Sequence, residues 1–523
     1  MSQATMPRRK VVIVGGGTAG WLAACYLAKK LGTEATGGLD ITLVESPDIG
    51  IIGVGEGTFP TIRQTLKVIG LDEATFLREC HATFKQGIRF DNWERADSHY
   101  FHPFDLPYRN REELDLVPYW LLQDSRTRPP FAQALTFQKY LADLKRAPKR
   151  RFEGGFEGPL NYAYHFDAVR FAALLAKHGQ SLGVRHLTGT LNSVTLADDG
   201  SVAGITTAEQ GELTADFYID CTGFRSELIG KALKTPFKSV QHILFNDRAV
   251  ACQIPYDAAD TPIASYTIST AHEAGWTWDI GLNSRRGVGY VYSSAHSSDD
   301  RAEEILRAHV GQDITPRRLQ FATGYRTQHW VKNCLCIGLS GGFLEPLEST
   351  GIVLIESAIS KFTEFFPHDG PADASSKMFN DLITTRYETI IGFIKLHYCL
   401  SKRPEPYWRE NADAATIPER LQDLLTRWAY RPPSRFDFIV DNESFAYFSY
   451  QYILYGMNYA TDFAAARGSH AHVKQAENLF GLIRHLGEQA AAELPDHRDL
   501  IDDIYANGFT VPQASRLMTA GRS

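Results

Sequence analysis

Lys10-Val-Val-Ile-Val-Gly-Gly-Gly-Thr-Ala-Gly20 joins a short β-branched run to a cluster of glycines. The apolar run is typical of a buried parallel strand, and residues 21–31 have helical character. Residues 40–45, Asp-Ile-Thr-Leu-Val-Glu, predict a second strand that ends in an acid. Strand, glycine turn, helix and strand in this order predict a parallel sheet with a dinucleotide site at the turn.

Each glycine of the cluster has an expected task. Gly15 suits the tight turn, Gly17 allows a pyrophosphate to approach the backbone, and Gly20 allows the helix to pack closely. Glu45 is placed to bind ribose hydroxyls. The alternative is a tight turn without a ligand, which the surrounding strand and helix pattern disfavours. The expected cofactor contacts in this part of the chain are Gly15, Gly17, Thr18, Ala19, Gly20 and Glu45.

Two later strands indicate which dinucleotide binds. Residues 215–220 predict a strand that leads into Cys221-Thr-Gly, and residues 334–337 predict another that leads into a glycine-rich stretch over 338–351. Flavoproteins with two dinucleotide-binding domains resemble this arrangement, so FAD is favoured over NAD. The later stretch adds Gly338 and Ile352 to the expected cofactor contacts.

The stretch Gly338-Leu-Ser-Gly-Gly-Phe-Leu-Glu-Pro-Leu-Glu-Ser-Thr-Gly351 places two acids, Glu345 and Glu348, just before an apolar helix. A helix start directs free N–H groups and the positive end of the helix dipole outward, so Thr350 and Gly351 can hold an anion. The alternative is an ordinary capped helix, in which both acids only favour the positive terminus.

We expect an α/β fold: a FAD module of the type with two dinucleotide-binding motifs, combining a parallel sheet with antiparallel insertions, and a helix-rich C-terminal module. The predicted FAD module spans residues 1–370, with inserted substrate elements at about 76–135 and 240–325. Residues 371–523 are predicted to be mainly helical and to cover the substrate. Strand-like alternation marks residues 83–90 and 250–294.

The composition is that of a globular protein, with 44% hydrophobic and 22% charged residues and a formal charge of -7. No basic field attracts nucleic acid or an anionic membrane, and no window resembles a membrane helix. Residues 1–10 do not resemble a signal peptide, so a cytoplasmic location is expected. Seven scattered cysteines lack metal-site spacing and are expected to be buried free thiols.

Taken together, these motifs resemble the flavin-dependent tryptophan halogenases and their indole-halogenating relatives. The resemblance covers most of the chain up to about residue 410. The residues that carry it are Gly15-Gly-Gly-Thr-Ala-Gly-Trp21, Phe84-Lys85, Trp276-Thr-Trp-Asp-Ile280 and Phe343-Leu-Glu-Pro-Leu-Glu-Ser-Thr-Gly-Ile352. It implies that dioxygen and chloride or bromide react at reduced FAD (FADH2) to give hypohalous acid, which then halogenates an aromatic ring at a separate place.

The resemblance also implies residue roles. Lys85 relays the halogenating species, and Glu348 stabilises or removes the proton of the cationic ring intermediate. Thr350 and Gly351 offer their amide groups to the halide. In isolation, a surface lysine whose stem rests on Phe84 and Ile88 explains Lys85 better, and the relay role is favoured only beside the other motifs.

Aromatic residues complete the expected site. Trp276 and Trp278 keep the organic substrate away from the oxidising centre, although sheet packing alone also explains them. Gly281 stands where the family's WxWxIP motif has proline. His102 and Phe104 match an aromatic loop that sandwiches the indole ring.

Substrate specificity departs from the family pattern. Tryptophan-specific members clamp the amino acid with an adjacent tyrosine pair followed by an acid. The corresponding region here has single tyrosines and no such pair. Free indole or another electron-rich aromatic is therefore the expected substrate.

A separate NAD(P)H flavin reductase is the expected source of FADH2, because no second site for NADH is apparent. A homodimer is the expected assembly. Two alternatives stay open at this stage: a flavin-dependent aromatic hydroxylase, and a non-catalytic flavoprotein.

Overall fold

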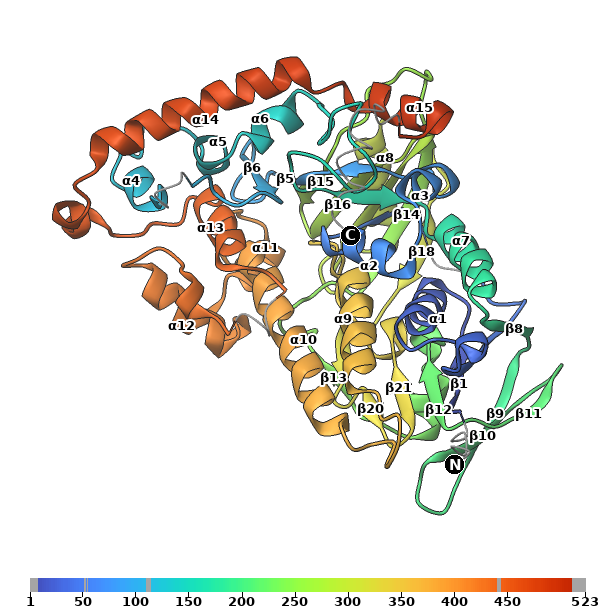
Figure 1. Ribbon diagram of the computed structural model, residues 1–523. Coiled ribbons are helices and arrows are strands. Elements are labelled where there is room, and N and C mark those ends of the chain that lie inside the picture. Colours follow the sequence, from blue (N-terminus) through green and yellow to red (C-terminus); the bar gives the residue numbers. More distant parts are fainter. Residues whose placement is uncertain (1–7, 51–52, 54, 110–113, 440–443, 510–523) are drawn as a thin grey trace, which may run out of the picture. The chain divides into compact units, whose positions relative to one another are not determined.

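The computed structural model describes residues 8–50, 53, 55–109, 114–439 and 444–509; its helices and strands are shown in Figure 1. The chain packs into two compact units. Unit 1 comprises Met1–Cys80, Phe166–Val240 and Phe321–Glu388, and unit 2 comprises His81–His165, Gln241–Gln320 and Thr389–Ser523. The division at residue 370 stays a prediction. Residues 1–7, on which the signal-peptide argument rests, lie outside the described residues.

Unit 1 is built on a six-stranded sheet in the order β20-β21-β12-β1-β2-β8. β1 lies between β2 and β12 and is parallel to both, with Val12 opposite Thr42 and Tyr218. The predicted parallel α/β sheet is therefore confirmed. Its strands are β1 (Lys10–Val14), β2 (Asp40–Glu45), β8 (Arg185–Thr188), β12 (Phe217–Asp220), β20 (Trp330–Val331) and β21 (Cys334–Cys336).

The helices of unit 1 pack around α1 (Thr18–Lys30), which contacts α2, α7 and α9. Because α1 is enclosed, its side chains are almost all apolar up to Lys29. The other helices are α2 (Thr61–Ile69), α3 (Glu73–Glu79), α7 (Ala168–Ser181) and α9 (Thr350–Phe365). Small strands complete the unit: β3 (Glu56–Gly57), β9 (Leu191–Leu196), β10 (Val202–Thr207), β11 (Gly211–Leu213), β13 (Phe237–Ser239), β19 (Gly324–Arg326) and β22 (Gly342–Phe343).

Unit 2 contains a seven-stranded sheet in the order β18-β14-β17-β16-β15-β5-β6. All its pairs are antiparallel except β15 with β5. The antiparallel insertion predicted over residues 250–294 is thus confirmed. The strands are β5 (Gly87–Asp91), β6 (His99–Pro103), β14 (Arg248–Pro255), β15 (Thr267–His272), β16 (Gly275–Gly281), β17 (Arg285–Tyr292) and β18 (Arg317–Gln320).

The strand predicted over residues 83–90 is two strands in the structure. β4 (Thr83–Lys85) pairs antiparallel with β7 (Ala163–Phe166), and β5 joins the large sheet. Gln86 separates them because its amide group donates to the carbonyl of Arg146 at 2.8 Å and to the hydroxyl of Ser265 at 2.9 Å. Alternation along the chain does not reveal this break, since both partners are distant in sequence.

The C-terminal part is helical, as predicted, with α10 (Ser376–Cys399), α11 (Pro406–Asn411), α12 (Glu419–Trp428), α13 (Tyr447–Gly456), α14 (Val473–Glu493) and α15 (His497–Asn507). Earlier helices of unit 2 are α4 (Val117–Leu121), α5 (Phe131–Leu135), α6 (Gln138–Asp143) and α8 (Asp299–Val310).

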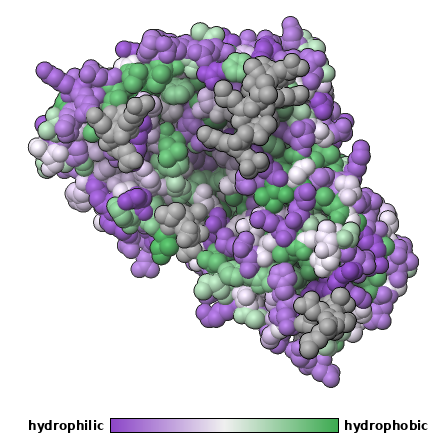
Figure 2. Space-filling model, in the orientation of Figure 1, coloured by the Kyte–Doolittle hydropathy of each residue, from purple (hydrophilic) through white to green (hydrophobic). Residues whose placement is uncertain are grey.

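All seven cysteines are free thiols; five are buried, and Cys221 and Cys399 are half-buried. None of the helices within the described ranges has both the length and the apolar composition needed to cross a bilayer. Figure 2 shows hydrophilic side chains over much of one face of the molecule, with hydrophobic residues gathered in smaller groups.

Candidate active site

The glycine turn after β1 has the geometry that its sequence predicts. Gly15 has a φ of +117°, and a Cβ there would lie 2.2 Å from the carbonyl oxygen of Cys221. A Cβ on Gly20 would lie 1.9 Å from the carbonyl oxygen of Gly15, so α1 packs directly on the turn. Around Gly17, by contrast, no atom lies within 4 Å of the Cβ position. The backbone at Gly17 is therefore open to close approach by a ligand, at the place where a pyrophosphate is expected.

The start of α1 is suited to an anion. Gly17 is its N-cap, no side chain caps the first N–H groups, and the first turn holds no acid. These donors and the positive end of the helix dipole point toward the glycine turn. Thr18 and Ala19 belong to this first turn. The backbone of this turn therefore fits the phosphates of a dinucleotide.

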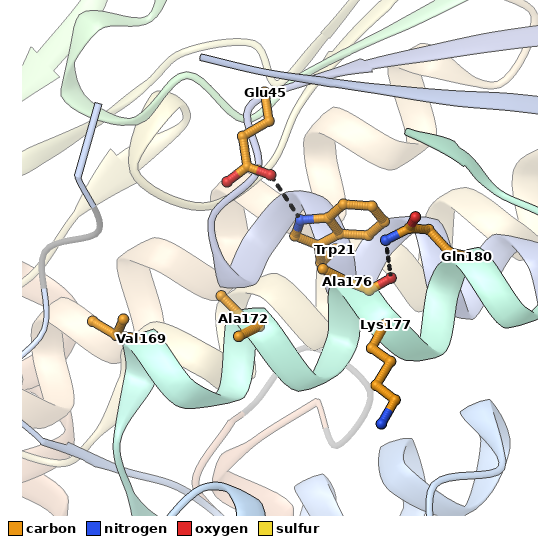
Figure 3. Close-up of a pocket in the computed structure, with 9 residues that line it drawn as sticks. Trp21, Glu45, Val169, Ala172, Ala176, Lys177 and Gln180 are labelled. Carbon is orange, nitrogen blue, oxygen red and sulfur yellow. Dashed lines mark hydrogen bonds between the residues drawn. The ribbon is translucent and has the colours of Figure 1, made fainter. Parts of the chain in front are cut away.

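Glu45 lies at the end of β2 beside a cavity of about 550 Å³. The indole N–H of Trp21 donates to its carboxylate at 3.4 Å, and Nε2 of His186 lies 3.1 Å from the same oxygen. Figure 3 shows Glu45 and Trp21 on one side of this cavity and α7 on the other. The cavity is lined by Gly16, Trp21, Glu45, Val169, Ala172, Ala173, Ala176, Lys177 and Gln180. Its small apolar wall and terminal acid suit a nucleoside.

The stretch over residues 338–351 lies in the same unit as the glycine turn. A Cβ on Gly338 would be 2.9 Å from Cβ of Ala19, so two of the expected cofactor contacts are neighbours. α9 then begins at Thr350, as predicted, after Ser349 with a φ of 58°. Ile352 is buried two residues later.

Thr350 and Gly351 differ in exposure. Thr350 is fully buried, and its hydroxyl has no hydrogen-bond partner among the described residues. Gly351 is exposed, and nothing lies within 4 Å of its Cβ position. Such a helix start offers an orphan polar group and an open amide to a small anion. Glu345 and Glu348 are both 1% exposed, so burial alone does not tell the two acids apart.

Lys85 lies at the end of β4 in unit 2 and is fully buried. Its ammonium nitrogen is 5.4 Å from the ring centroid of Phe104, in a cation–π arrangement. A surface lysine is excluded. The backbone of Phe104 is held by a hydrogen bond from its N–H to the carbonyl of Gln86 at 3.1 Å.

Two hydrogen bonds anchor the strand that carries Lys85. The Thr83 hydroxyl donates to the carbonyl of Gly281 at 2.6 Å, and the Phe84 N–H donates to Nε2 of His497 at 3.0 Å. His497 is therefore neutral with its proton on Nδ1, facing the carbonyl of Ile263, and burial lowers its pKa to about 4. No local motif points to His497, because it lies 413 positions from Phe84.

Trp276 and Trp278 project from one face of β16, with ring centroids 6.3 Å apart. A Cβ on Gly289, the residue opposite Trp278, would lie 2.2 Å from that indole ring, so the ring lies flat over the glycine. Gly281 also leaves little room, because its Cβ would be 2.7 Å from a methyl group of Ile263.

His102 lies in β6 and not in a loop, which corrects the sequence-based interpretation. It pairs with Ile88 of β5, a partner that the local pattern of residues 100–120 does not reveal. Its ring is 4% exposed and lies near aromatic residues of α10 and the C-terminal region, namely Phe393, Phe445 and Tyr452. Phe104 is half-buried and follows directly after this strand.

Two further groups escaped the sequence analysis. Glu356 of α9 accepts hydrogen bonds from the hydroxyls of Thr61 at 2.8 Å and Thr65 at 2.5 Å, both on α2. Burial raises its pKa to about 7. His165 of β7 is fully buried beside β4. The partners of Glu356 and His165 are far from them in sequence, so no local motif predicts these contacts.

A parallel sheet, a glycine turn and an uncapped helix start are together typical of a dinucleotide-binding protein. The sequence model described as tryptophan halogenase matches residues 10–472, so the chain belongs to the tryptophan halogenase family. It is a flavin-dependent halogenase, and its co-substrates are FADH2, dioxygen and halide.

Individual relatives agree. The tryptophan 6-halogenase SttH of Streptomyces toxytricini is 36% identical over 86% of this chain and 89% of its own length. A tryptophan halogenase structure from Shewanella frigidimarina superimposes with a TM-score of 0.90 at 40% identity, covering 97% of this chain and 99% of that one. Tar14, a tryptophan C-6 flavin-dependent halogenase, gives a TM-score of 0.88 at 35% identity over 95% and 99%.

Proposed function

We propose that this enzyme halogenates an indole-type aromatic ring by electrophilic substitution, with Lys85 and Glu348 as the catalytic residues. The observation that supports this most strongly is the fully buried ammonium of Lys85 facing the ring of Phe104. Burying an ammonium group costs free energy, so a chemical role explains this lysine better than stability alone does. Family membership supplies the reaction type.

FAD supplies the oxidising chemistry when it is bound, and the chain holds it through backbone groups. We assign its phosphates to the turn over Gly15, Gly17 and Gly20, and its ribose to Glu45. The open space at Gly17 and the cavity beside Glu45 support this assignment. Gly338 and Ile352 are assigned to the ring side of the same cofactor.

Thr350 and Gly351 are assigned to the halide. The unpaired buried hydroxyl of Thr350 and the open amide of Gly351 support an anion at this helix start. We assign Trp276 and Trp278 to the wall that keeps the aromatic substrate from the oxidising centre.

In the proposed substitution the halogen passes from hypohalous acid to the ring, and two proton transfers accompany it. A ring carbon attacks the halogen of hypohalous acid, the carbon–halogen bond forms, and the oxygen–halogen bond breaks. The leaving oxygen takes a proton from the Lys85 ammonium and departs as water. The Glu348 carboxylate takes the proton that the ring carbon loses, and this proton restores the ammonium. The aromatic substrate and hypohalous acid thereby give the aryl halide and water.

The proposed substrate is free indole or a similar electron-rich ring. His102 and Phe104 are assigned to the ring-binding wall. Tyrosines of α13 do not form a free clamp for an amino acid: Tyr452 donates to the carbonyl of Asp105 at 3.3 Å, and the Tyr447 hydroxyl accepts a bond from Arg109 at 2.7 Å. Tyr455 pairs with Thr461.

We further propose that a separate NAD(P)H flavin reductase supplies FADH2 in the cytoplasm, and that the enzyme is a homodimer. The purified enzyme is then expected to turn over only when a flavin reductase is added. Its molecular mass in solution is expected to be twice that of one chain.

Mass spectrometry tests the reaction directly. The enzyme is incubated with flavin reductase, NADH, FAD and oxygen, with chloride or bromide, and with indole or tryptophan. The expected product is a haloindole with the isotope doublet of its halogen. A hydroxylated product formed without halide contradicts the proposal and indicates an aromatic hydroxylase, whereas bound flavin without any turnover indicates a non-catalytic flavoprotein.

Variants then test the residue roles. Lys85→Met is expected to lower aromatic halogenation about a thousandfold or more while hypohalous acid is still formed. Glu348→Gln is expected to lower it about a hundredfold, and Glu345→Gln, equally buried, serves as the matched control with near wild-type activity. Equal losses in the two glutamate variants contradict the assignment to Glu348.

A further inference from the structure

His165 shares one face of a two-stranded ribbon with Lys85. β4 and β7 pair so that Thr83 faces His165 and Lys85 faces Ala163. Side chains alternate along strands, so Thr83, Lys85, Ala163 and His165 project to the same side. Lys85 and His165 are thus diagonal neighbours, a spacing within reach of long side chains.

The opposite face of this ribbon holds a different kind of group. Phe84 packs there against the rings of Tyr162 and Tyr164, with centroid distances of 5.1 Å and 6.1 Å. One face of the ribbon therefore packs against aromatic rings. The other face carries the ammonium of Lys85 and the imidazole of His165.

One nitrogen of the His165 ring is held and the other is not. Nε2 lies 2.8 Å from the hydroxyl of Thr267 on β15. Nδ1 is buried and has no hydrogen-bond partner among the described residues. A buried polar atom without a partner is unfavourable in a purely structural side chain. The Thr267 bond fixes the ring, so Nδ1 is available to a small polar molecule that reaches Lys85.

The imidazole also remains neutral. Burial, then the charge of Lys85, then His497 hold the pKa of His165 well below its ordinary value. A neutral ring beside the ammonium adds no second positive charge and offers either a lone pair or an N–H at Nδ1. Hypohalous acid carries both an O–H donor and an oxygen acceptor, so it can pair with either tautomer.

We propose that Nδ1 of His165 is a second contact for hypohalous acid, which it holds and orients together with the ammonium of Lys85. This inference rests on the proposed role of Lys85. Two polar contacts fix the direction of the oxygen–halogen bond, whereas one contact leaves the halogen free to turn. The expected consequence is efficient transfer to the ring with little escape of hypohalous acid.

Two amide variants separate the two ring nitrogens. In His165→Asn the amide lies near the position of Nδ1, and in His165→Gln it lies near the position of Nε2. The measured quantity is coupling: the amount of halogenated aromatic formed per hypohalous acid, with a soluble scavenger reporting the acid that escapes. We expect His165→Asn to keep coupling within about threefold and His165→Gln to lose about tenfold, the effect of one lost polar contact.

Thr267→Val is the matched control, because it removes the bond at Nε2 and leaves Nδ1 in place. Its coupling is expected to stay near that of the wild type. If His165 only maintains the fold, the order is reversed: His165→Gln is tolerated, and Thr267→Val and His165→Asn are impaired. That order, or equal coupling in all variants, overturns the inference.

Dilute hypobromous acid added to flavin-free protein with indole gives a second readout that does not depend on the cofactor. The wild type is expected to direct bromination to fewer ring positions than His165→Gln does, and identical product mixtures overturn the inference. Lys85→Met distinguishes failure of the proposed Lys85 role from failure of the proposed His165 role. If Lys85→Met keeps full coupling, the proposed function fails; if it loses coupling while His165→Gln does not, only the inference fails.

Discussion

Units 1 and 2 differ in the charge of the side chains that they bury. Among the described residues, every buried lysine or arginine lies in unit 2: Lys85, Lys139, Lys149, Lys395 and Arg498. In the described parts of the chain, unit 1 instead buries the acidic residues Glu73, Asp220, Glu345, Glu348 and Glu356, and unit 2 buries Glu94 and Asp247.

This difference matches two ways of binding. The uncapped start of α1 in unit 1 presents backbone N–H groups that suit an anionic cofactor. In unit 2 several buried ammonium groups lie against aromatic rings, as Lys85 does against Phe104. A cation among rings suits a neutral, electron-rich substrate and an electrophilic halogen. Four predictions test how far this contrast holds.

Gly20→Ala is expected to have the largest effect. The added Cβ meets the carbonyl oxygen of Gly15 at 1.9 Å, so α1 must move off the turn. We expect a loss of about 3 kcal/mol in the free energy of unfolding and at least a hundredfold weaker FAD binding.

Gly17→Ala is the control for this change, because its Cβ meets no atom within 4 Å. It should leave the flavin-free protein as stable as the wild type and weaken only FAD binding. Thermal unfolding with and without FAD measures both. Equal destabilisation by the two variants contradicts the assignment of Gly17 to cofactor approach.

Glu356→Gln tests the buried acids of unit 1. Its pKa is raised to about 7 in the folded protein from 4.5, so the unfolded chain loses its proton at lower pH. The stability that Glu356 contributes is therefore present below about pH 4.5 and is lost as the pH rises through about 7. Glutamine does not ionise, and we expect the variant to be more stable by about 3 kcal/mol at pH 8.

The measurement is the difference in thermal midpoint between this variant and the wild type from pH 4.5 to pH 8. The difference should be near zero at the acid end and grow toward neutral pH. A difference that is independent of pH would show that the hydrogen bonds to Thr61 and Thr65, and not ionisation, dominate.

Lys395→Met tests whether halogenation depends on Lys85 in particular or on buried cations of unit 2 in general. Its ammonium donates to the carbonyl of Ile243 at 3.0 Å and to Asn411 at 2.9 Å. Lys395→Met removes both hydrogen bonds, of which the one to Asn411 is buried, and we expect a loss of about 2 kcal/mol in stability. Halogenation per folded molecule should be unchanged, which activity normalised to folded protein will show.

Glu45→Gln is expected to have the smallest effect, about tenfold weaker FAD binding, because the charged contact that we propose to the ribose becomes neutral. Titration of the flavin-free protein with FAD measures it. Glu34→Gln is the control, since Glu34 forms an exposed ion pair with Arg8. A loss in both variants would point to general electrostatics and not to a ribose contact.

The sequence predicts those parts that depend on neighbouring residues. The strand, turn and helix over residues 10–30 and the start of α9 at Thr350 follow from local composition. The residues that contact these elements from distant parts of the chain do not follow from local composition. Thr65 and Glu356 are 291 positions apart, and β5 pairs with β6 where the sequence predicted a loop at His102. Such partners are fixed by folding, and no local pattern encodes them.

Ser349 has a consequence for protein engineering. A φ of 58° is readily adopted by Gly, Asn or Asp and is unfavourable for β-branched side chains. This single residue sets the backbone direction between Glu348 and Thr350. Libraries that vary the substrate wall should therefore keep Ser349 or restrict it to glycine and asparagine, since most other choices would misalign both neighbours at once.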